Sequence, residues 1–84
     1  MSKNITIDGI DAIATPDPDI CSYLKWSIVE KTTGLSLMPP SWPGSESAET
    51  LEGAISIVRR HTIEPLGLEN IKRKIESVRL RMEE

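Results

Sequence analysis

The sequence contains a single cysteine, Cys21, and a single histidine, His61, among its 84 residues. One cysteine cannot form a disulfide within the chain, so no covalent cross-link of this kind stabilises the fold. A Cys21–His61 dyad is the one thiol and imidazole pair that the composition allows, and nothing in the spacing of the two residues supports it. We therefore expect no catalytic residues and a protein that is not an enzyme.

Motifs for metals and nucleotides are also missing from the sequence. It has no CxxC, no HxxxH and no spaced run of aspartates of the kind that binds calcium. Gly44 precedes a predicted helix, but Glu46 and Glu49 follow it, and their carboxylates would repel a phosphate group. The sequence therefore predicts no metal site and no cofactor.

Long apolar runs are absent as well. No run approaches the roughly 18–20 apolar residues of a membrane-spanning helix. The opening residues, MSKNITIDG, lack the apolar segment of a signal peptide. Together with the single cysteine, these absences lead us to expect a cytoplasmic protein with no membrane contact.

Aromatic residues are scarce, at 4 % of the chain, and phenylalanine is absent. The length of residues 1–84 predicts one small domain, which buries roughly 60–65 % of its surface. The core therefore has to come mainly from isoleucine, leucine and valine. We expect low stability unless a partner or a second copy contributes to it.

Charge is unevenly distributed, although the formal net charge is only −3. Residues 1–52 carry eight acidic and three basic side chains, whereas residues 53–84 carry five acidic and seven basic ones. A nucleic-acid-binding surface is normally more basic than this. Nucleic acid is therefore the alternative partner and not the favoured one.

The N-terminal segment has the pattern of a β-hairpin. Asp8-Gly9 lies between two runs in which apolar and polar residues alternate, which predicts a hairpin over about 4–13. A two-residue turn would pair Ile7 with Ile10 and place the apolar residues of both strands on one face.

Residues 20–33 fit two patterns. The alternation over 24–28 and the content of strand-forming residues predict a second hairpin, over about 22–38. Alternatively, Asp17 caps a helix that begins at Pro18. We adopt the strand, and the helix stays open as the alternative.

The segment from residue 38 to residue 47 is rich in proline, which excludes a helix interior or a central strand. Trp42 lies in its middle, between Pro40 and Pro43. An aromatic side chain in such a loop can bury a large area at low entropic cost, so we predict that Trp42, Pro40 and Pro43 bind a partner. The alternative is that Trp42 folds back and completes the core.

Two helices are predicted in the remainder of the chain, over about 47–61 and 68–83. The short link between them contains Pro65 and Gly67. Links of this length usually join antiparallel neighbours, so we expect the two helices to form an antiparallel pair.

The last helix has an apolar seam with heptad spacing, formed by Leu68, Ile71, Ile75, Val78 and Met82. The residues that flank this seam are all basic, namely Lys72, Lys74, Arg79 and Arg81. Two parallel copies would bring like charges together, so we expect a monomer in which the seam packs on the preceding helix of its own chain. The alternative is a homodimer with an antiparallel four-helix interface between two copies. We predict that Arg73, Arg79 and Arg81 contact a partner.

These patterns together predict an α+β fold, with two antiparallel hairpins followed by an antiparallel helical pair. The alternative is one hairpin with three helices. The expected function is that of a non-enzymatic protein-binding module, an inhibitor, adaptor or accessory protein that occupies a surface of a larger partner. Its small size is consistent with a phage protein. The alternative is a nucleic-acid-associated regulator that uses the basic C-terminal helices.

Overall fold

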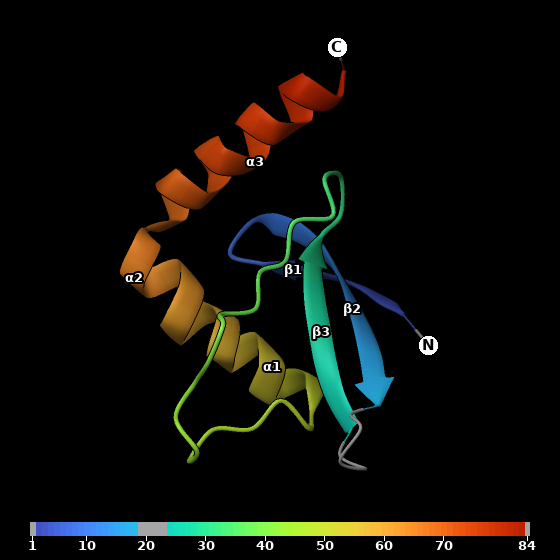
Figure 1. Cartoon of the computed structure of the whole chain (residues 1–84), viewed down its shortest axis with the longest axis vertical. Helices are drawn as coiled ribbons and strands as arrows, with labels where there is room; N and C mark the ends of the chain where they lie inside the picture. Colours follow the sequence, from blue (N-terminus) through green and yellow to red (C-terminus); the bar gives the residue numbers. More distant parts are fainter. Residues whose placement is uncertain (1, 19–23, 84) are drawn as a thin grey trace.

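The computed structural model describes residues 2–18 and 24–83, which form a small sheet followed by helices (Figure 1). The three strands, in the order β1-β2-β3 across an antiparallel sheet, are β1 (Lys3–Ile7), β2 (Ile10–Pro18) and β3 (Leu24–Glu30). The helical part comprises α1 (Leu51–Val58), the π-helical turn η1 (Arg59–Ile63), α2 (Glu64–Leu66) and α3 (Leu68–Met82). The predicted α+β class is confirmed.

The first hairpin is confirmed together with its register. Ile7 lies opposite Ile10. The two turn residues, Asp8 and Gly9, have φ angles of 49° and 86°. Positive φ at both positions is what a two-residue type I′ turn requires, and it explains the Asp-Gly sequence. One face of this hairpin enters the core.

The strand interpretation of residues 20–33 is confirmed where the structure describes them, because β3 pairs along its length with β2. Residues 19–23 lie outside the described residues. The second predicted hairpin is only partly formed, since a single bridge joins Ser36 to Val29 beyond the turn. The prolines that begin at Pro39 have no backbone N–H to donate to a longer ladder.

The first helix starts and ends later than predicted. It begins after Thr50, whose hydroxyl accepts a hydrogen bond from the N–H of Gly53 at 3.0 Å. It then continues through η1 and α2, so the predicted link is itself largely helical. In the π-helical turn the N–H of Glu64 bonds the carbonyl of Arg59. Pro65, which has no N–H to donate, follows directly after this π-helical turn.

The predicted antiparallel pairing of the long helices is matched only roughly. Figure 1 shows α1 and α3 diverging from the junction at Gly67 instead of lying side by side. Gly67 has φ 86° and ψ 132°, so the direction of the chain changes at a single residue. No loop remains that could reverse the helix axis. As a result, α1 packs on the sheet, and α3 crosses its end near the β1–β2 turn, where Lys72 lies beside Gly9 (Figure 1).

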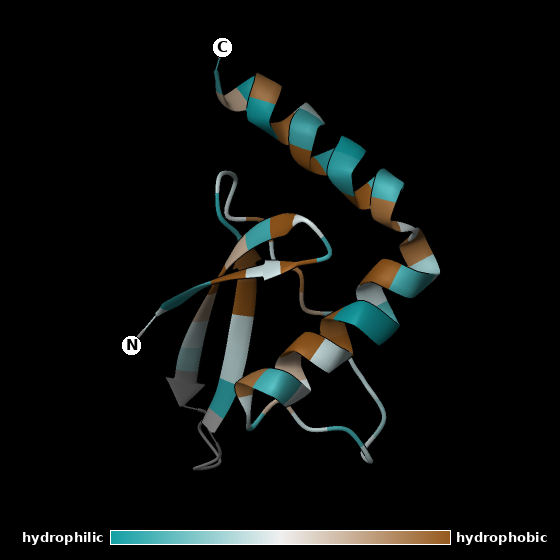
Figure 2. Cartoon of the chain, turned by 180° about the vertical axis from the view of Figure 1, so that it is seen from behind, coloured by the Kyte–Doolittle hydropathy of each residue, from teal (hydrophilic) through white to brown (hydrophobic). Residues whose placement is uncertain are grey.

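The core lies mainly between the sheet and α1. Its fully buried large side chains are Ile7, Ile28, Ile57 and Val58. Gly53 lets the preceding loop lie against α1, because a Cβ at this position would be 2.2 Å from the carbonyl oxygen of Ser47. From α3, Ile71 and Ile75 reach this core. Hydrophobic residues nevertheless recur along α3 as far as its last turn (Figure 2).

Candidate functional site

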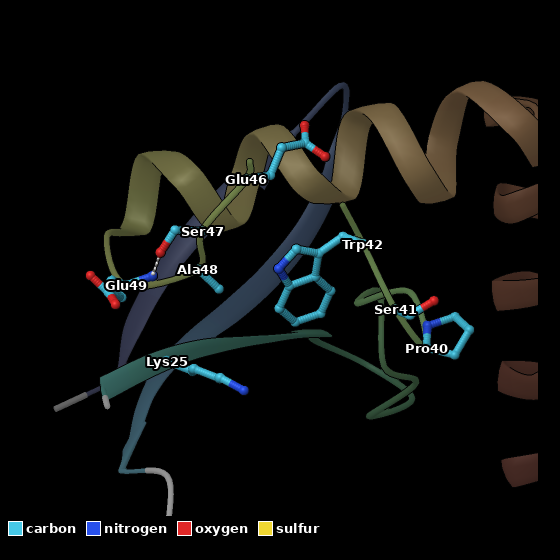
Figure 3. Close-up of a pocket in the computed structure, with 8 residues that line it drawn as sticks. All are labelled: Lys25, Pro40, Ser41, Trp42, Glu46, Ser47, Ala48 and Glu49. Carbon is cyan, nitrogen blue, oxygen red and sulfur yellow. Dashed lines mark hydrogen bonds between the residues drawn. The ribbon is translucent and has the colours of Figure 1, made fainter. Parts of the chain in front are cut away.

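The loop between β3 and α1 places Trp42 beside an open hollow. Figure 3 shows the indole ring between α1 and β3, with Lys25 on the strand below it. The hollow, here called the Trp42 hollow, has a volume of about 430 Å³ and is lined by Lys25, Pro40, Ser41, Trp42, Glu46, Ser47, Ala48 and Glu49. Trp42 is half-buried and packs against the core. The alternative, in which Trp42 folds back onto the core, is therefore met in part, and partner binding by Trp42 stays a prediction.

The loop that carries Trp42, here called the Trp42 loop (residues 38–50), contacts both β3 and η1. The N–H of Trp26, on β3, donates to the carbonyl of Ala48 at 2.8 Å. On the helical side, the imidazole of His61 contacts the carboxylate of Glu46, and Arg60 lies 3.5 Å from the same carboxylate. His61 thus has a carboxylate partner in the loop. Cys21, the other half of the dyad considered above, lies outside the described residues.

The arginines predicted to bind a partner occupy different sides of α3. Arg79 donates to the hydroxyl of Thr32 at 3.2 Å and to the carboxylate of Glu76 at 3.0 Å, so it ties α3 to the turn after β3. Arg73 and Arg81 are exposed. None of the three lines the Trp42 hollow, so the structure does not bring the residues predicted for partner binding into one site.

A second hollow, which sequence reasoning missed, lies between α3 and the segment 35–37. This hollow, here called the α3 groove, has a volume of about 420 Å³. Its apolar lining consists of Leu35, Leu37, Leu66, Ile71 and Ile75. Its polar lining consists of Ser36, Thr62, Asn70 and Lys74. Because these residues come from three separate segments, no local pattern in the sequence could have indicated the groove.

The most exposed apolar side chains of the described residues gather in this part of the chain. Leu66, Leu80 and Met82 are 59 %, 55 % and 61 % exposed. Leu66 lines the α3 groove, and Met82 belongs to the seam that continues from it. Leu80 is five residues from Ile75, which places it about 140° around the helix, on the far side. Leu80 is therefore an exposed leucine outside the groove.

The opposite edge of α3 faces a buried carboxylate. Glu30 is 2 % exposed and lines a hollow together with Lys72 and Arg79. Burial alone would raise the pKa of Glu30, but hydrogen bonds from the N–H and hydroxyl groups of Thr32 and Thr33 outweigh it and hold this pKa below its ordinary value. Sequence reasoning missed this role. The available signal was the sequence Glu-Lys-Thr-Thr-Gly, residues 30–34, at the end of a strand.

Within residues 2–18 and 24–83, no cluster of three or more histidine, cysteine, aspartate or glutamate side chains could hold a metal ion. Over the same residues, no helix has the length and apolar character that crossing a bilayer requires. No family model, curated protein or solved structure matches this chain. The function therefore has to be inferred from the two surfaces described above.

Proposed function

We propose that this protein is a non-enzymatic protein-binding module that occupies a surface of a larger partner through its α3 groove. The observation that carries the proposal is the lining of the groove, in which leucine and isoleucine side chains surround a hollow open to solvent. Leu66, at 59 % exposure, keeps most of its surface in water. Apolar hollows of this kind favour association because binding removes their surface from water.

The wall of the groove opposite α3 is held by backbone hydrogen bonds. The N–H of Leu37 donates to the carbonyl of Ile28 at 2.9 Å, and the N–H of Glu30 donates to the carbonyl of Leu35 at 2.7 Å. The hydroxyl of Thr62 also donates to the carbonyl of Leu37 at 2.7 Å. A surface that is already formed loses less conformational entropy when a partner binds, which favours affinity.

The Trp42 hollow is the second contact surface in this proposal. Its lining includes charged side chains, among them Glu46 and Glu49, and part of the indole area is already used by the core. Trp42 and Pro40 therefore offer less free apolar area than the α3 groove does. The nucleic-acid alternative has weaker support, because the basic residues of α3 lie all around the helix and Arg79 is engaged within the chain.

Selection of a library of randomised amphipathic helical peptides on the full chain tests the proposal. We expect enriched peptides to bind the wild type and to lose affinity by about tenfold or more when Leu66→Ser is introduced. Leu80→Ser is the matched control, because Leu80 is almost as exposed, at 55 %, and lies on the far side of α3. It should leave affinity unchanged. Failure to enrich any peptide, or equal binding to Leu66→Ser, would contradict the proposal.

A further inference from the structure

The two basic edges of α3 have different surroundings. One edge carries Lys72 and Arg79, which share a hollow with the carboxylates of Asp11, Glu30 and Glu76. The positive charge on this edge therefore has acidic neighbours in its own chain. It is already balanced without a partner.

The other edge carries Lys74 and Arg81. Lys74 lines the α3 groove, and no carboxylate lines the groove with it. Arg81 follows Lys74 by seven residues, which places it on the same side of the helix two turns further on. Among the described residues, neither side chain forms an ion pair. This edge therefore presents positive charge with no acidic partner beside an apolar groove.

The apolar seam that borders this edge leaves the core gradually. Ile71 and Ile75 are 7 % and 6 % exposed, Val78 is half-buried, and Met82 is 61 % exposed. From Ile71 to Met82 the seam extends about 16 Å along the helix axis. A strip of this length, with side chains at helical spacing, suits another helix lying alongside α3.

We infer that the occupant of the α3 groove is an amphipathic helix of the partner, with an apolar stripe in the groove and acidic residues on the flank that meets Lys74 and Arg81. This inference rests on the proposed protein-binding function and names the chemistry of the partner. A second copy of α3 is a poor occupant, because its own seam is flanked by basic residues on both edges. Lys74 would then face another base in either orientation.

Two synthetic helical peptides of about 15 residues provide the probe. They share one leucine stripe and differ on a single flank, which is glutamate in the acidic peptide and lysine in the basic peptide. In titration calorimetry with the full chain, we expect the acidic peptide to bind about tenfold more tightly than the basic one. Its affinity should fall as salt is added.

Variants of the chain locate the charge that is recognised. Lys74→Glu should weaken binding of the acidic peptide severalfold, whereas Arg73→Glu, the same charge change on the adjacent residue facing away from the groove, should alter it less than twofold. The double variant Lys74→Glu/Arg81→Glu should reverse the preference, so that the basic peptide binds more tightly. A misfolded variant could not produce such a reversal.

The outcomes separate this inference from the proposal on which it rests. If both peptides bind equally and Leu66→Ser weakens both, the groove accepts helices without regard to charge, and the acidic partner is overturned while the proposed function stands. If neither peptide binds, both are overturned. If Arg73→Glu and Lys74→Glu weaken binding of the acidic peptide equally, the net charge of the chain, and not the charge at the groove edge, determines the affinity. This result also overturns the inference.

Discussion

The sheet with α1 and the C-terminal helix α3 are rich in the same aliphatic side chains, but they bury them to different extents. Ile28 and Ile57 have no exposed surface, whereas Leu80 and Met82 on α3 are more than half exposed. The difference follows from placement. α1 packs on the sheet, and α3 crosses only its end (Figure 1). One part of the chain is therefore a closed core, and the other leaves apolar surface exposed.

The largest expected effect comes from the closed part. Ile57→Ala should lower the free energy of unfolding by about 2–5 kcal/mol, because it opens a cavity among fully buried side chains. Met82→Ala should change it by less than about 0.5 kcal/mol, because Met82 is exposed. Urea denaturation of both variants measures the difference. If both variants lost similar amounts of unfolding free energy, α3 would be as tightly packed as α1, and the contrast between the two parts would be wrong.

The turn after β3, which lies beside α3, depends on Glu30. Glu30→Gln should cost about 2 kcal/mol at neutral pH, because the carboxylate accepts several hydrogen bonds from Thr32 and Thr33. Since folding lowers the pKa of Glu30, its stabilisation is complete above the ordinary pKa and is lost as the pH falls through the folded-state value. Urea denaturation at several pH values should show the two proteins converging in acid. A constant difference at all pH values would contradict this role.

Gly53 tests how tightly the closed part is packed. In an exposed helix, glycine to alanine stabilises by about 1 kcal/mol. Here Gly53→Ala should destabilise by about 1–2 kcal/mol, because the added Cβ meets the carbonyl oxygen of Ser47 at 2.2 Å. Ser77→Ala, on an exposed position of α3, is the control and should be neutral or slightly stabilising. A stabilised Gly53→Ala variant in urea denaturation would rule out the close approach.

The smallest effect is expected where α3 is tied to the turn after β3. Arg79→Ala should cost less than about 1 kcal/mol, because its contacts with Thr32 and Glu76 are exposed. Amide hydrogen exchange in the C-terminal half of α3 should nevertheless become faster, with β2 and β3 unchanged. Arg73→Ala, the control, should leave the exchange rates of α3 and of the two strands unchanged. Uniformly faster exchange throughout the chain would show that α3 and the sheet open together.

The features that the sequence predicted well are local ones. The turn at Asp8-Gly9 determines the hairpin register because both residues adopt positive φ. The bounds of α3 were predicted nearly to the residue, because its apolar seam has a regular period over four turns. In both cases the signal and the structure involve the same short segment.

The features that were missed depend on tertiary placement. The direction of α3 follows from the backbone angles of Gly67, which the glycine permits but does not specify. The helix continues to Leu66 because a π-helical turn precedes Pro65, an irregularity that no periodic pattern shows. The α3 groove combines segments 35–37, 62–66 and 70–75. The burial of Trp42 likewise depends on how its loop packs against α1 and β3, which the local sequence does not determine.

Amide hydrogen exchange of the full chain, measured with and without the acidic peptide, tests the central claim most directly. The α3 groove as binding surface predicts that the peptide slows exchange in residues 71–82 and 35–37 and leaves the β1–β2 hairpin unchanged. Slower exchange confined to the loop around Trp42, or no change anywhere at saturating peptide, would contradict it.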